Sequence, residues 1–184
     1  GHARQCGLNQ AKGAYHICID ADTIYPPHYI ETHIKELRKK GVVGTFSLWS
    51  FIPDKTHSKF GLWLYETLRD LHLTIQAIQR PELCVRGMTF GFNTELGRRF
   101  GFRKDIILGE DGSLALALMP NGKLIFIHSR KARVMTGYGT LNNDGGLLNS
   151  FKIRVIKGLR GIGSIFSKKK EYKDEENNLI KRNK

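Results

Sequence analysis

The sequence has few cysteines and no long apolar runs. Its 184 residues include three cysteines, and no two of them form a Cys-x-x-Cys pair. An odd, scattered set argues against a disulfide framework and favours a reducing compartment. No apolar run approaches the roughly 18 to 20 residues that a membrane span needs. We therefore expect a cytoplasmic protein, either free or bound to the inner face of the cell membrane.

Acidic residues are scarce relative to basic ones. Seventeen Asp and Glu stand against 30 Lys and Arg, which gives a net charge of +13. This balance suits nucleic acid, anionic lipid or a phosphorylated ligand, and it also fits a solvated basic surface with no such partner. The aromatic residues fall mainly on apolar stripes, so we do not expect nucleic acid to be the partner. The length and the 40% hydrophobic content fit one globular domain.

The order of the predicted elements is that of an α/β fold. A helix over residues 3–13, ended by Gly13 in a left-handed conformation, leads into a strand over 14–19. A helix over 26–41, opened by two prolines and closed by a glycine, precedes a strand over 42–49. This alternation of helices and strands predicts an α/β sheet.

The second half continues with helices and short strands. Residues 58–76 have helical periodicity, and one side of the predicted helix is expected to pack against the core: Leu62, Tyr65, Leu68, Arg69 and Leu73. A small helix follows near residue 95, and a helix over 110–118 leads through an Asn-Gly turn into a strand over 123–128. A last short strand is predicted over 132–136.

The composition changes at Phe151. We expect residues 1–150 to form the domain and residues 151–184 to form a basic tail. On a helix, Ile153, Ile156, Leu159 and Ile162 share one side, and basic residues occupy much of the rest, a pattern typical of helices that lie on anionic lipid. Three glycines in this stretch weaken a helix, so a packed or disordered tail is an equal alternative.

Two aspartates, Asp20 and Asp22, end the strand over 14–19. The carboxyl ends of strands in α/β sheets are where ligands bind. Carboxylate oxygens there suit Mg²⁺ or Mn²⁺ that also holds substrate phosphates. The alternative is an Asx turn in which Asp22 caps the following helix.

The segment "GLNQAKGAYHICIDADTIYPPHYI" resembles the nucleotide-sugar site of family 2 glycosyltransferases. The later segment "RGMTFGFNTELGRRFGFRKDIILGEDGSLALAL" is similar to the acceptor side of that family, and "ARVMTGYGT" occupies the place of another of its motifs. The resemblance covers roughly residues 4–148. It implies a GT-A (Rossmann-like) fold, a nucleotide-diphospho-sugar donor, a glycan or lipid-linked acceptor, and a metal-dependent, inverting transfer.

The resemblance also assigns roles to individual residues. Asp111 matches the general base, Glu110 its partner, and Asp22 the ligand of the divalent metal, Mg²⁺ or Mn²⁺, while Asp20 faces the ribose or a metal-bound water. We expect the start of helix 110–118 to favour the ionised form of Asp111. Further matches are Arg4 and Asn9 on the donor side, Arg86, Gly87 and Met88 on the acceptor side, and His128 as a second metal ligand.

Each of these assignments has a structural alternative. Glu110 and Asp111 have the composition of a helix N-terminus, and His128 that of a hydrogen-bonded histidine at a strand end. Arg4 and Asn9 fit exposed helix positions, and residues 86–88 fit a strand end and turn. Where relatives carry an arginine, this chain has Gly137-Tyr138-Gly139, and Arg130 and Arg133 are the candidates to replace it.

The family's opening strands have no counterpart in the sequence. We therefore expect residues 1–184 to be the later portion of a GT-A domain and to be inactive alone.

Two other classes fit parts of the sequence. In phosphatases of the haloacid dehalogenase type, a D-x-D-x-T/V motif follows the first strand, but Ile24 stands in the T/V place and no second acidic metal motif follows. A basic module that binds nucleic acid or membrane without catalysis is the other alternative.

Overall fold

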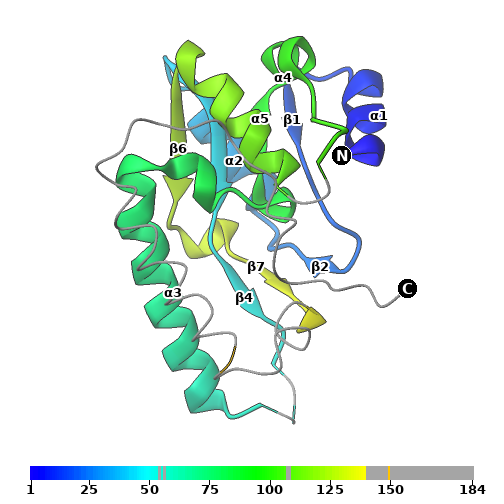
Figure 1. The fold of residues 1–184 in the computed structure, drawn as a ribbon. Coiled ribbons are helices and arrows are strands. Elements are labelled where there is room, and N and C mark those ends of the chain that lie inside the picture. The colour runs from blue at the N-terminus through cyan, green and yellow to red at the C-terminus, as the bar shows by residue number, and fades with distance from the viewer. Residues whose placement is uncertain (54, 56, 107–108, 140–148, 150–184) are drawn as a thin grey trace.

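A four-stranded mixed sheet forms the centre of the described part of the chain (Figure 1). The computed structural model describes residues 1–53, 55, 57–106, 109–139 and 149. The strand order is β1 (Tyr15–Ile17), β5 (Gly91–Asn93), β3 (Val42–Ser47), β6 (Lys123–Ile127). Strand β5 is antiparallel to both neighbours and β6 is parallel to β3. Strands β1, β3 and β6 are therefore parallel to one another, so their carboxyl ends point the same way. The mixture of sheets and helices confirms the predicted α/β class.

A second, three-stranded sheet continues from the first. Its order is β2 (Thr23–Ile24), β7 (Val134–Thr136), β4 (Trp49–Phe51). Strand β3 runs through Leu48 into β4, so one chain segment contributes to both sheets. Strand β2, which the sequence did not predict, begins directly after Asp22. The loop between β1 and β2 is therefore held by one sheet at each end.

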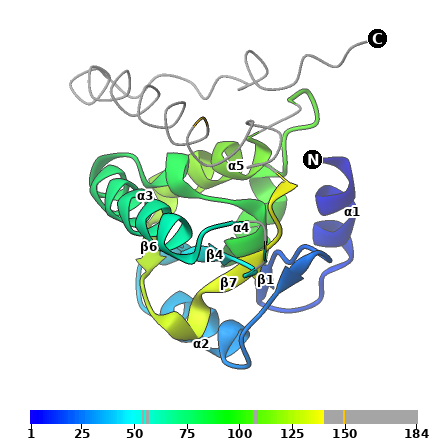
Figure 2. The same cartoon turned by 90° about the horizontal axis from the view of Figure 1, so that it is seen from below.

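Five α-helices surround these sheets in the described residues: α1 (His2–Gln10), α2 (Tyr29–Leu37), α3 (Lys59–Gln79), α4 (Thr94–Phe100) and α5 (Glu110–Leu118). Short 3₁₀ turns complete the path: η1 (Pro81–Cys84), η2 (Gly87–Thr89), η3 (Met119–Asn121) and η4 (Arg130–Ala132). Helices α1 and α3 lie on opposite sides of the molecule in both views (Figures 1 and 2). None of the described helices combines the length and the apolar character needed to cross a bilayer.

Three local predictions have different outcomes. Gly13 does not adopt a left-handed conformation, because α1 ends at Gln10 and Ala11 is already extended toward β1. Gly41 does have a positive φ of 79° and reverses the chain between α2 and β3. Leu68 is exposed, so the buried face of α3 consists of Leu62, Tyr65, Arg69 and Leu73. The predicted tail, residues 151–184, lies outside the described residues.

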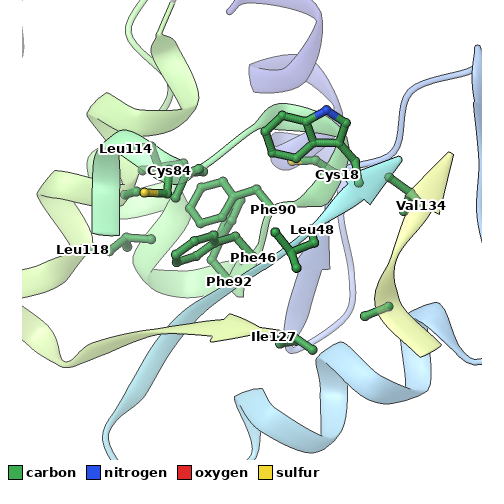
Figure 3. Packing of buried hydrophobic residues seen from close by; sticks show 14 of the residues in the cluster. Cys18, Phe46, Leu48, Cys84, Phe90, Phe92, Leu114, Leu118, Ile127 and Val134 are labelled. Atoms are coloured by element: carbon green, nitrogen blue, oxygen red, sulfur yellow. The ribbon is translucent and has the colours of Figure 1, made fainter. Parts of the chain in front are cut away.

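The core packs both faces of the central sheet. Phe46 of β3 and Phe90 and Phe92 near β5 are completely buried, and Leu114 and Leu118 of α5 pack in the same cluster (Figure 3). The Phe92 ring lies against Gly97 of α4, where a Cβ atom would overlap the ring. Burial of apolar groups of this size stabilises the fold by about 1.5–3 kcal/mol per side chain. The core thereby fixes α5 against the sheet.

His33 is a polar residue inside this core. Its Nδ1 lies 2.8 Å from the Thr45 hydroxyl, and its ring packs on Tyr29 at 4.5 Å. Its Nε2 is buried and has no hydrogen-bond partner among the described residues. Burial lowers the pKa of His33 to about 4. The imidazole is therefore neutral in the folded protein at neutral pH.

We predict that His33 makes the protein acid-sensitive. The pKa is about 4 in the folded state and about 6.5 in the unfolded chain, so the unfolded state binds the proton first. The contribution of His33 to stability is complete above pH 6.5, and it declines by about 3 kcal/mol as the pH falls toward 4. Urea unfolding at several pH values measures this decline.

His33→Asn should remove that part of the pH dependence. His28→Gln, a change at an exposed histidine, should leave it intact. An unchanged pH dependence in His33→Asn would show that other groups cause the acid sensitivity.

Candidate active site

One guanidinium, that of Arg4, joins three carboxylates from two other parts of the chain. Arg4 Nη1 donates to Oε1 of Glu110 at 2.8 Å and to both carboxylate oxygens of Asp111 at 2.9 Å. Its Nη2 donates to Oδ1 of Asp20 at 3.0 Å. Two acidic motifs that are far apart in the sequence therefore meet at one basic side chain.

Glu110 and Asp111 are placed by the start of α5. Gly109, the residue before the helix, has a φ of 94°, a left-handed conformation that glycine adopts without a Cβ penalty. The turn puts the two acidic residues in the first turn of a helix whose other face is buried in the core. Both side chains are largely buried, with 12% exposure each. The helix start thus holds two carboxylates in a partly desolvated place.

Asp20 is held by a short hydrogen-bond chain. Its backbone N–H donates to the Tyr25 hydroxyl at 2.7 Å, and that hydroxyl donates to the carbonyl oxygen of Met88 at 3.2 Å. The Tyr29 hydroxyl donates to the same carbonyl at 3.2 Å. Tyr25 and Tyr29 lie on either side of the double proline. Through their hydrogen bonds to Met88 they connect the Asp20 loop to residues 86–88. This role of Tyr25 was not predicted from the sequence, although the tyrosine before the two prolines is visible there.

Gly87 makes room for Arg4. A Cβ atom at position 87 would overlap the Arg4 guanidinium. Any larger residue would therefore displace the guanidinium from the carboxylates. The sequence analysis placed Gly87 on the acceptor side, and the structure adds this contact to that prediction.

Burial and charge set the proton affinities at this site. Burial raises the pKa of Asp111 to about 6, the charge of Arg4 opposes this rise, and Glu110 and Asp20 add to it. Burial lowers the pKa of Arg4, but Asp111 and Asp20 more than compensate and hold it above its ordinary value. Burial also raises the pKa of the neighbouring Cys18 thiol to about 12. Arg4 is therefore charged, Cys18 is neutral, and Asp111 titrates near pH 6.

An open cleft adjoins this cluster. It has a volume of about 610 Å³, and Arg4, Asp20 and Glu110 are among the residues that line it, together with residues 16–19. This volume is in the range of sites for small molecules and cofactors. Around Arg4, three carboxylates face one guanidinium, and the amino group of Gly1 lies 3.5 Å from Oε1 of Glu110.

The residues near the cleft fit part of a divalent metal site. No group of three or more His, Cys, Asp or Glu side chains in the described residues could hold a metal by itself. Mg²⁺ is commonly bound through one or two carboxylates, with waters and substrate phosphates as the other ligands. Asp22 is exposed and Asp20 is partly exposed, so these two oxygen donors fit an ion that is shared with a diphosphate.

The other predicted residues lie at different places. Asn9 is exposed and accepts a hydrogen bond from Gln5 at 2.8 Å. Arg86 donates to the carbonyl oxygens of Leu83 and Val85, and its charge acts on Asp111. His128 is exposed at the end of β6, on the opposite edge of the central sheet from β1. The structure brings together Arg4, Asp20, Gly87, Met88, Glu110 and Asp111, and it does not bring Asn9 or His128 to them.

The two arginines considered as replacements for the missing family arginine have different surroundings. Arg133 pairs with Asp70 at 2.5 Å and donates to the Ser50 hydroxyl at 3.1 Å. Arg130 is exposed, and both arginines line a separate cavity beside α3. The role of either residue at the donor diphosphate stays a prediction.

We predict that Gly87→Ala disturbs the site without unfolding the protein. The new methyl group displaces the flexible Arg4 side chain, so Asp111 loses the charge that opposes its raised pKa. The pKa of Asp111, measured by carboxyl NMR titration, should rise above 6. The lost charged hydrogen bonds should lower the free energy of unfolding by about 1–3 kcal/mol.

Gly137→Ala is the matched control, because a Cβ atom at position 137 meets no atom of the described residues within 4 Å. It should leave both quantities unchanged. A Gly87→Ala protein with the pKa of Asp111 still at 6 would show that Arg4 does not control this carboxyl.

Comparisons with known proteins give the family and the fold. The model of the family described as "Glycosyl transferase family 2" matches residues 1–108. A comparison with curated proteins finds no match.

Two solved structures are similar to the chain. One is the mannosyltransferase PcManGT from Pyrobaculum calidifontis, in complex with GDP-Man and Mn²⁺, with a TM-score of 0.55 and 15% identity, covering 89% of this chain and 48% of that one. Mannosyl-3-phosphoglycerate synthase from Rubrobacter xylanophilus has a TM-score of 0.46 and 16% identity, covering 94% of this chain and 55% of that one. The chain thus spans about half the length of these structures.

The first of these similarities supports the fold prediction. The likeness to the Pyrobaculum enzyme confirms the expected GT-A fold. The family match favours the glycosyltransferase hypothesis over a haloacid dehalogenase or a non-catalytic basic module. This chain belongs to glycosyl transferase family 2.

Proposed function

We propose that the protein is an inverting, metal-dependent glycosyltransferase that transfers a sugar from a nucleoside-diphosphate sugar to a glycan or lipid-linked acceptor. The observation that carries the proposal is the contact of one guanidinium, Arg4, with the carboxylates of Asp20 and Asp111 beside an open cleft. The family membership and the nucleotide sugar bound in the Pyrobaculum structure support the donor class.

Asp20 and Asp22 form the donor side of the proposed site. Both lie in the loop that follows the carboxyl end of β1, and ligands bind at the carboxyl ends of strands in α/β folds. They would hold Mg²⁺ or Mn²⁺ together with the oxygens of the donor diphosphate. A bound divalent ion would supply positive charge to the diphosphate that leaves.

Asp111 is the proposed general base. The acceptor hydroxyl oxygen attacks the anomeric carbon, the bond from that carbon to the diphosphate breaks, and the hydroxyl proton passes to a carboxylate oxygen of Asp111. With a pKa of about 6, roughly nine tenths of Asp111 is ionised at pH 7. Each carboxylate oxygen has a second lone pair, so the bonds from Arg4 leave room for this proton.

Arg4 positions the two halves of the proposed site. Its Nη2 holds Asp20 on the donor side, and its Nη1 holds Asp111 and Glu110 on the base side. A base must lie within hydrogen-bond distance of the proton it removes. The fixed spacing of these carboxylates through a planar guanidinium therefore determines how far the donor sugar and the acceptor hydroxyl can be apart.

Residues 86–88 form the proposed acceptor side. Met88 is tied to the Asp20 loop through Tyr25 and Tyr29, and Arg86 acts on the charge of Asp111. An acceptor bound at this turn would be next to the base. The described residues offer oxygen and guanidinium groups there, which suit a glycan hydroxyl or a lipid phosphate.

We predict that Asp111→Asn in the full-length protein lowers the rate by about 10²- to 10⁴-fold, the usual contribution of a positioned base. The amide keeps the shape of the side chain and cannot take the proton. The wild-type kcat/KM should fall tenfold per pH unit below about pH 6, where Asp111 becomes protonated. Steady-state assays from pH 5 to 8 measure both effects.

Asp105→Asn, at an exposed carboxylate that pairs with Arg103, should retain full activity and the same pH profile. Normal turnover in Asp111→Asn would remove this residue from the mechanism.

We predict that Asp22→Asn weakens the binding of the divalent metal on the donor side. The Mn²⁺ concentration for half-maximal activity should rise at least about tenfold, since one charged ligand becomes a neutral amide. Titration of activity with Mn²⁺ after chelation measures the change. An unchanged Mn²⁺ dependence would assign the metal to other residues.

A further inference from the structure

Helix α3 has an exposed apolar face along its whole length, which we name the α3 stripe: Phe60, Trp63, Leu64, Leu68, Leu71, Ile75 and Ile78. These side chains are between 38% and 79% exposed. Phe60 and Ile78 are 18 positions apart, which at about 1.5 Å per residue is about 27 Å of helix. Thr67 and Thr74 complete the same side, so no charged residue interrupts the stripe.

The stripe lies nearly half a turn from the buried face of the same helix. Leu62, Tyr65 and Leu73 face the core, and at 100° per residue Leu71 and Ile75 point the other way. A surface helix normally has polar residues on the side away from the core. A contiguous apolar patch of this kind marks an interaction surface.

The charges beside the stripe favour an anionic partner. The Glu66 carboxylate accepts hydrogen bonds from the backbone N–H of Phe51 and from the Ser50 hydroxyl. Asp70 forms ion pairs with Arg69 and Arg133. Arg130 is exposed and lines, with Trp63, a cavity of about 360 Å³ at the side of the stripe. Asp70 is thus neutralised, and Arg69, Arg130 and Arg133 together exceed Glu66 and Asp70 by one positive charge beside the stripe.

We propose that the α3 stripe rests on an anionic lipid bilayer, with its apolar side chains at the boundary between headgroups and acyl chains. A chain with a net charge of +13 is attracted to an anionic surface, whereas two such chains repel each other, so the charge favours lipid over a second copy. Phe60 and Trp63 are aromatic residues of the type that prefers this boundary. The stripe belongs to α3, which is a different segment of the sequence from the predicted basic tail.

The test uses the fluorescence of the full chain with vesicles. The sequence has two tryptophans, of which Trp49 is buried and Trp63 is 60% exposed. With vesicles of phosphatidylcholine and phosphatidylglycerol, Trp63 emission should shift to the blue, and lipids brominated on the acyl chain should quench it. Phosphatidylcholine alone should bind at least tenfold more weakly. An emission spectrum that does not change with the mixed vesicles would overturn the proposal.

The double variant Leu71→Gln/Ile75→Gln separates the stripe from the tail. It keeps every basic residue and removes apolar surface from the stripe alone, so binding to the mixed vesicles should weaken at least tenfold. Ile30→Gln is the matched control, because Ile30 of α2 is 59% exposed on another element; its binding should equal the wild type. Equal binding of the double variant would assign the membrane contact to other residues and overturn the proposal.

Two measurements without lipid address other occupants of the stripe. Light scattering that shows a dimer in the wild type and a monomer in the double variant would identify a second copy as the partner. Protection of Trp63 from acrylamide in the monomeric protein would show that another segment of the chain covers the stripe. Either result contradicts the proposal; a monomer with an accessible Trp63 supports it.

Discussion

The candidate site depends on one guanidinium, that of Arg4, which forms hydrogen bonds to three carboxylates. Asp20, Glu110 and Asp111 come from two segments about 90 residues apart, and without Arg4 their negative charges would repel one another. The guanidinium makes their approach possible, since its planar fork can bind several carboxylates at once. The remaining features serve this contact: Gly87 leaves space for the guanidinium and Gly109 starts the helix that carries two of the acids.

The position of this site also relates to the proposed membrane surface. Helix α1, which carries Arg4, and helix α3 lie on opposite sides of the molecule (Figures 1 and 2). A bilayer in contact with α3 therefore leaves the cleft beside α1 accessible from water, where a nucleotide sugar is dissolved.

The sequence predicted best what depends on neighbours along the chain. Long periodic segments such as α3 and the apolar run of β3 were found because burial repeats with the period of the element. Strand β2 was missed because a strand of two residues has no detectable periodicity. Gly13 was predicted to end the first helix in a left-handed conformation, but α1 ends earlier, at Gln10, and Gly13 does not have a positive φ. Asp20, Glu110 and Asp111 were found as motifs, but no local pattern could show that Arg4, 106 residues from Glu110, joins them. The apolar residues of α3 were likewise visible, yet only the fold separates the buried face from the stripe.

The proton affinity of Asp111 shows why such a site requires the folded protein. The sequence predicted that the helix start would favour the ionised carboxylate, an effect of about 0.3–1 kcal/mol. Burial acts in the opposite direction and is larger, so the pKa rises from 3.8 to about 6. The raised pKa contributes stability below pH 3.8 that is lost as the pH rises through 6, a cost of about 3 kcal/mol at neutral pH. A base with a pKa near the working pH removes a proton more effectively than an exposed aspartate does. The same burial that destabilises the folded protein thus makes Asp111 a stronger base, and Arg4 limits the rise so that the carboxylate is still ionised at pH 7.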